Sequence, residues 1–131
     1  MEMKAAQELC GRWLPAWTGN QPDSLIDFYA VDAFYRDPAR PGGLRGHAEI
    51  LPYFKRLLAQ NPQWTWEPME LFPTEKGFTA KWKATIPVGG KVVTEYGMDI
   101  VEVSGGKIVR NEVYFDRASL LSALAANHNR A

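Results

Sequence analysis

The feature that most constrains this chain is a change of hydrophobic period after Pro62. Before that residue, apolar side chains recur every three or four positions, which is typical of amphipathic helices. After it, apolar and polar side chains alternate, which is typical of half-buried antiparallel strands. The alternation is most regular in one set of side chains: Phe78, Ala80, Trp82, Ala84 and Ile86. Helices followed by strands predict an α+β fold.

The first half of the sequence predicts three helices. The first covers residues 4–18 and contains Pro15, which should bend or shorten it. The second is short and covers residues 23–29. The third runs from about Gly46 to the turn signal at Asn61.

One short strand is expected among these helices, over residues 33–36. Asp37-Pro38 should end it, and Pro41-Gly42-Gly43 reads as a loop. The second half predicts a four-strand antiparallel meander with turns at glycine-containing segments. Its strands should cover residues 63–73, 78–86, 91–103 and 107–115, and Asp116 should cap a terminal helix.

Composition narrows the function classes. The 131 residues fit a single domain over 1–131, and 15 basic side chains balance 15 acidic ones. Zero net charge disfavours nucleic acid and anionic membranes as partners. With one cysteine, Cys10, and two histidines, neither a disulfide nor a metal site is expected. No segment resembles a signal peptide or a membrane span, so the expected location is the cytoplasm.

The order of these motifs resembles the nuclear transport factor 2-like superfamily. The resemblance rests on residues 28–33 before Asp37-Pro38 and on Gly46 opening the long helix. The ending, residues 106–116, is similar to the SnoaL-like branch of that superfamily. This implies a cystatin-like α+β roll, in which a curved antiparallel sheet and N-terminal helices form a cone with an internal pocket. Members include ketosteroid isomerase, polyketide cyclases and non-enzymes, so the fold leaves the function open.

Asp37 and Asp99 are the candidate catalytic residues. An Asp-Pro pair is commonly only a turn, but the resemblance to ketosteroid isomerase places the general base at Asp37, with Tyr29 at a similar spacing before it. Asp99 shares a strand face with Val101, which should point inward. The resemblance implies a protonated acid there that donates to an oxyanion. Glu95 would lie on the same face of the strand as Asp99, which weakens the assignment of that face to the interior. The alternatives are that Asp99 faces outward or that it only bonds a neighbouring helix.

The remaining candidates are expected to bind substrate. The resemblance aligns Trp13 and Phe54 with the two tyrosines of the ketosteroid isomerase oxyanion site. Neither has a phenol, which argues against steroid isomerisation itself. Asn111 would orient a ligand carbonyl or merely satisfy Asp99. Three large rings would form either core or substrate wall: Trp17, Trp82 and Phe115.

The sequence therefore predicts a pocket protein, with two functions left open. One is a cofactor-free isomerase, cyclase or dehydratase that moves a proton on a small apolar carbonyl compound. The other is a non-catalytic ligand-binding or dimeric scaffold domain. In either case we expect a homodimer through the outer face of the sheet, which carries Lys81, Lys83, Arg110 and Glu112.

Overall fold

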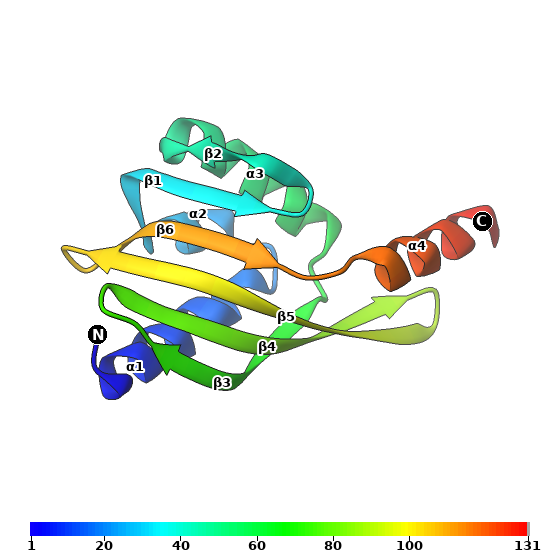
Figure 1. Ribbon diagram of the computed structural model, residues 1–131. Helices are drawn as coiled ribbons and strands as arrows, with labels where there is room; N and C mark the ends of the chain where they lie inside the picture. The colour runs from blue at the N-terminus through cyan, green and yellow to red at the C-terminus, as the bar shows by residue number, and fades with distance from the viewer. Residues whose placement is uncertain (131) are drawn as a thin grey trace.

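The computed structural model describes residues 1–130 and has one sheet with helices over it (Figure 1). The elements follow in the order α1 (Met3–Trp13), the 3-10 helix η1 (Leu14–Trp17), α2 (Pro22–Ile26), β1 (Tyr29–Asp37), β2 (Arg40–Arg45), α3 (Gly46–Gln60), β3 (Thr65–Pro73), β4 (Gly77–Val88), β5 (Lys91–Ser104), β6 (Lys107–Tyr114) and α4 (Ala118–Arg130). The α+β class expected from the sequence is confirmed.

The six strands form a single mixed sheet in the order β2-β1-β6-β5-β4-β3. All neighbours are antiparallel except β1 and β6, which pair in parallel. Helices α1, α2 and α3 lie over one face, and α4 projects from one end of the sheet (Figure 1). The sheet is therefore covered by helices on one side, and the functional cavity lies on that side.

The alternation that predicted β4 is confirmed. Phe78, Ala80, Trp82, Ala84 and Ile86 are all buried, while the side chains between them are exposed at Lys81 and half-buried elsewhere. β4 pairs with β5 along its whole length without a register shift. Because side chains alternate across a strand, this unbroken pairing fixes one apolar face on both strands, and that face packs under the helices.

The first half differs from the expected bounds of its elements. The first helix is shortened at Pro15, as expected, and does not reach residue 18: α1 ends at Trp13, and a 3-10 turn with Pro15 in its first turn replaces the rest. Proline lacks the backbone N–H that a continuing α-helix would use, so the chain changes its helix type there. The short strand is also longer than expected and begins at Tyr29 instead of residue 33.

The expected loop at Pro41-Gly42-Gly43 is instead part of the edge strand β2. An edge strand pairs on one side only, so a proline there costs no ladder hydrogen bond on its free side. The four-strand meander is likewise extended to six strands, because β1 inserts beside β6. No described helix is both long enough and apolar enough to cross a bilayer.

Candidate functional site

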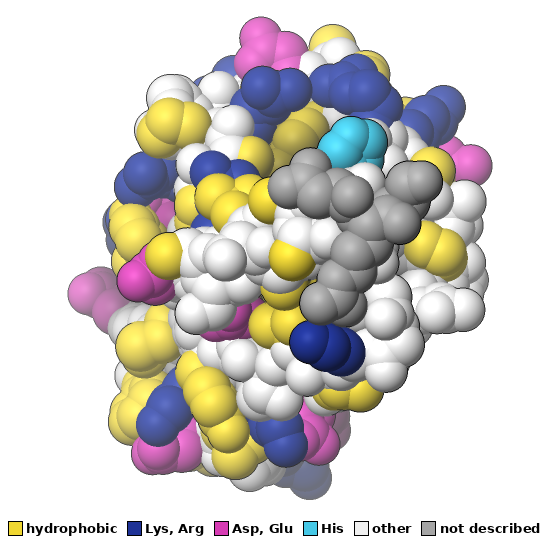
Figure 2. Space-filling view, turned by 90° about the vertical axis from the view of Figure 1, so that its right-hand side faces the viewer, with side chains coloured by type: hydrophobic (Ala, Val, Ile, Leu, Met, Phe, Trp, Pro, Cys, Tyr) yellow, Lys and Arg dark blue, Asp and Glu magenta, His cyan; other side chains and the backbone are white. Residues whose placement is uncertain are grey.

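A cavity of about 410 Å³ lies between the covered face of the sheet and the helices. That volume is within the range of small-molecule sites. Its walls are largely aromatic, from Trp17, Tyr35, Tyr53, Trp64, Trp66, Trp82 and Phe115. Three arginines also line the cavity: Arg40, Arg56 and Arg117. On the surface, Lys and Arg side chains gather at the top of the view in Figure 2, which is the side on which α3 and β2 lie in Figure 1.

Asp37 lies at the end of β1 on this cavity and is 7% exposed. Its Oδ2 accepts hydrogen bonds from the hydroxyls of Tyr35 (2.7 Å) and Tyr53 (2.6 Å). Its Oδ1 accepts from the backbone N–H groups of Ala39 (2.8 Å) and Arg40 (3.0 Å). Asp37 therefore both stabilises the turn after β1 and lines the cavity. A carboxylate offers about four lone-pair positions, so these four donors fill the acceptor capacity of Asp37.

The two tyrosines at Asp37 are held in their protonated form. Burial is the main reason that the pKa of Tyr35 is raised well above its ordinary value, and the negative charge of Asp37 adds to it. Burial and the hydrogen bond to Asp37 likewise raise the pKa of Tyr53. Both phenols therefore keep the proton that they donate to Asp37.

Asp99 faces the same cavity from the middle of β5 and is 3% exposed. Its Oδ1 accepts a hydrogen bond from Trp82 Nε1 (2.7 Å), and its Oδ2 accepts one from Asn111 Nδ2 (2.8 Å). Burial raises the pKa of Asp99 from 3.8 to about 6, and the charge of Asp37 adds slightly to this, while the two N–H donors oppose it. The inward face expected for Asp99 is thus present, but a group with this pKa is mostly ionised at pH 7.

Behind Asp99 runs a buried chain of hydrogen bonds. Trp13 Nε1 donates to the hydroxyl of Tyr29 (3.1 Å), which donates to Asn111 Oδ1 (2.7 Å). Asn111 Nδ2 donates to Asp99 and also to the backbone oxygen of Ile100 (3.3 Å). Every polar atom of the Asn111 side chain is thus paired within the protein. This geometry matches the simpler alternative for Asn111, in which it satisfies Asp99.

The nine residues expected at the site separate into two groups. Asp37, Asp99, Trp17, Trp82 and Phe115 line the cavity. The other four pack behind its wall, fully or almost fully buried: Trp13, Tyr29, Phe54 and Asn111. The indole N–H of Trp13, expected to face an oxyanion, is used by Tyr29 instead.

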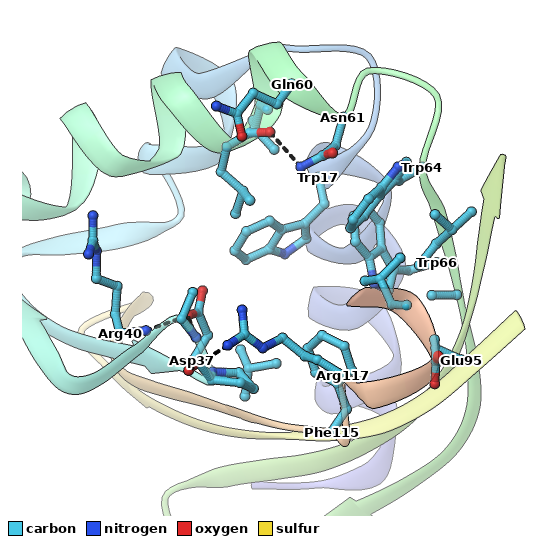
Figure 3. A pocket seen from close by; sticks show the side chains of 18 of the residues that line it. Trp17, Asp37, Arg40, Gln60, Asn61, Trp64, Trp66, Glu95, Phe115 and Arg117 are labelled. Atoms are coloured by element: carbon cyan, nitrogen blue, oxygen red, sulfur yellow. Dashed lines mark hydrogen bonds between the residues drawn. The ribbon is translucent and has the colours of Figure 1, made fainter. Parts of the chain in front are cut away.

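Several cavity residues were missed from the sequence. The sequence assigned no role at the site to Tyr53, Trp64, Trp66, Glu95 or Arg117, which all line the cavity. Arg117 donates from Nη2 to the backbone oxygen of Pro38 (3.4 Å) and extends beside Asp37 in Figure 3. The parity shared by Glu95 and Asp99 was the available signal for Glu95. Arg117 follows the last strand in an irregular segment, where no period indicates a direction.

Metal ligands are not clustered in the described part of the chain. Among residues 1–130, no three His, Cys, Asp or Glu side chains lie close enough together to hold a metal ion. The polar groups that line the cavity include carboxylates, phenols, amides and guanidinium groups. These side chains can accept, donate and balance a proton or a charge on an organic ligand.

Fold and cavity together define a class: an α+β cone protein with an aromatic pocket. Residues 11–111 match the SnoaL-like domain, and the chain belongs to that family. No curated protein matches the sequence.

Solved structures of similar fold share little sequence with this chain. A protein from Shewanella putrefaciens, proposed to be a SnoaL-like polyketide cyclase, is 16% identical, with a TM-score of 0.79 over 95% of this chain and 88% of that one. A hypothetical protein with a ketosteroid isomerase-like fold from Catenulispora acidiphila, in complex with trimethylamine, is 20% identical (TM-score 0.78, 90% and 92% covered). AclR from Streptomyces galilaeus, proposed to be a hydroxylase, is 16% identical (TM-score 0.78, 95% and 98% covered).

Proposed function

We propose that this protein is a cofactor-free enzyme that removes a proton from the carbon next to a carbonyl group in a small, mostly apolar compound. Isomerisation, cyclisation and dehydration all begin with this step. The observation that carries the proposal is that two buried carboxylates, Asp37 and Asp99, line one aromatic cavity. Asp99 combines burial with a raised pKa in a cleft, which is typical of acid–base sites.

Asp99 is the better proton acceptor of the two. Each of its oxygens accepts one hydrogen bond, which leaves a lone pair on each for a substrate proton. Asp37 has no such vacancy, because four donors already occupy it. A pKa of about 6 also brings Asp99 close to working pH, where a general base is most effective. This division reverses the roles expected from the sequence, which made Asp37 the base.

The negative charge that forms on the carbonyl oxygen needs a partner in the cavity. Arg117 supplies a guanidinium group, which stays protonated and lines the same cavity near Asp37. Asp37 then acts by fixing Tyr53 and Tyr35 at the cavity wall. Preorganised charge of this kind is usually a large contribution to catalysis.

The test is the exchange of α-protons for deuterium in 2-tetralone, a planar apolar ketone, followed by proton NMR in D₂O. The wild-type chain should accelerate exchange over buffer, and Asp99→Asn should lower the protein-dependent rate by about 100-fold or more. Asp32→Asn changes an exposed carboxylate and should leave the rate unchanged. If 2-tetralone binds but does not exchange faster than in buffer, the non-catalytic binding function is the correct one.

A further inference from the structure

Glu95 is a cavity carboxylate for which the proposed reaction has no use. Its side chain lines the cavity from β5, four residues before Asp99 on the same strand face. Within the described chain, Glu95 Oε1 is buried and accepts no hydrogen bond. No described Lys, Arg or His side chain lies within 4.0 Å of the Glu95 carboxylate. The Glu95 side chain as a whole is half-buried, and Oε1 is its buried oxygen. A buried anionic oxygen with neither donor nor counter-ion is costly, and a ligand in the cavity can supply the donor.

The neighbours of Glu95 form a recess around it. Across the sheet, Glu95 pairs with Ala84, and Ala84 pairs with Trp66 on the next strand. All three line the cavity. Adjacent strands are about 4.8 Å apart, so the backbones of Glu95 and Trp66 are about 10 Å apart, with only a methyl group between them. Small Ala84 is itself buried and forms the floor between them, so a ligand group in this recess would lie against Glu95 and Trp66.

The walls of this recess favour a positive charge. Trp66 is the centre of an indole cluster, since its ring lies 6.2 Å from the rings of both Trp17 and Trp64. Indole faces attract cations, most strongly where water is excluded. A neutral hydroxyl would satisfy Glu95 Oε1 but would leave the carboxylate charge unbalanced. An ammonium group with an N–H satisfies the oxygen, balances the charge and gains from the indoles.

We infer that the recess formed by Trp66, Ala84 and Glu95 is a binding subsite for an organic ammonium group. Figure 3 places Glu95 and Trp66 on the opposite side of the cavity from Asp37 and Arg40. Glu95 and Asp99 are four residues apart, about 13 Å along an extended strand. Combined with the proposed function, on which this extension rests, the substrate is a carbonyl compound that carries an amine about this far from its reacting carbon.

Two probes of the same skeleton test the subsite in the full chain. Cyclohexylmethylamine is a cation at pH 7.5, cyclohexylmethanol is neutral, and neither absorbs where tryptophan does, so intrinsic fluorescence reports binding. The wild-type chain should bind the amine about tenfold more tightly than the alcohol. Glu95→Gln keeps the side-chain shape and should abolish that preference. Glu67→Gln is the matched control, because it removes an equal charge from an exposed side chain on β3 and should keep the preference.

Equal affinity of the two probes for the wild-type chain would overturn the inference without any variant. A preference for the amine that survives in Glu95→Gln would also overturn it, because the charge would then be bound elsewhere, for example at Asp99. Neither result depends on catalysis. Failure of this test therefore leaves the exchange experiment with 2-tetralone, and the proposed role of Asp99, standing.

Discussion

Asp99→Asn replaces a buried titratable carboxyl group with a neutral amide of nearly the same shape, and it should change how stability depends on pH. The pKa of Asp99 is about 6 in the folded protein against 3.8 for the unfolded chain. The folded state therefore binds this proton more tightly than the unfolded state does. Protonation of Asp99 stabilises the fold, and that contribution is fully present below pH 3.8 and is lost as the pH rises through 6.

The magnitude follows from the two pKa values. Their difference corresponds to about 3 kcal/mol of unfolding free energy, of which about 2 kcal/mol falls between pH 4 and pH 7. The asparagine has one acceptor oxygen for two donors, Trp82 Nε1 and Asn111 Nδ2. One donor is left facing the amide N–H₂, at a cost of about 1–3 kcal/mol that does not vary with pH. The variant should thus be less stable than wild type at pH 4 and closer to it at pH 7.

Urea unfolding at pH 4, 5, 6 and 7, followed by tryptophan fluorescence, measures this directly. The difference in unfolding free energy between wild type and Asp99→Asn should shrink by about 2 kcal/mol from pH 4 to pH 7. Asp32→Asn, at an exposed position, should give a profile parallel to wild type. The reasoning is refuted if the wild-type and Asp99→Asn profiles are also parallel, because Asp99 would then have the same pKa in both states.

Three further predictions concern the cavity wall and the outer face of the sheet. Trp82→Phe removes the N–H that stabilises the Asp99 anion, so the pKa of Asp99 should rise above about 6 in a carboxyl-carbon NMR titration, and an unchanged value would contradict the role of the indole N–H. Trp82→Ala should lower the unfolding free energy by about 3–5 kcal/mol, as measured by urea unfolding. The outer face of the sheet exposes Tyr96, Met98 and Tyr114, and we expect the protein to form a homodimer through this face. Sedimentation velocity at micromolar concentration measures the oligomeric state, and a monomer would exclude the homodimer.

The sequence predicted those parts of the fold in which local period and pairing agree. β4 and β5 pair without a register shift, so the alternation of side chains along the strand correctly predicted that Asp99 lies on the covered face. Pairing between distant strands leaves no such local mark, which is why the position of β1 beside β6 could not be predicted. Pro41 reads as a loop signal because its tolerance on an edge strand depends on where that strand lies in the sheet.

The site was predicted less completely for a related reason. Periodicity tells which side chains are covered, but covered side chains can line a cavity or fill the core. Trp13 and Trp17 both lie in the first helical segment and are both buried, yet only Trp17 reaches the cavity. Tyr53 and Phe54 are adjacent on α3 and both buried, but Tyr53 holds Asp37 whereas Phe54 packs among rings. Only the three-dimensional arrangement distinguishes them.

The parallel pairing of β1 with β6 has a consequence for the order in which the molecule is assembled. Tyr35 on β1 pairs with Asn111 on β6, so the strand that ends at Asp37 joins the main sheet through residues near the other end of the sequence. Contacts this distant in sequence raise the contact order and slow folding, because a long loop must close before they form. During synthesis, β1 can pair with β2 and pack against α3, but it cannot join the main sheet until β6 has left the ribosome. The donors to Asp37 all lie between residues 35 and 53 and are available early, whereas Asp99 receives its hydrogen bond from Asn111 only after β6 has joined the sheet.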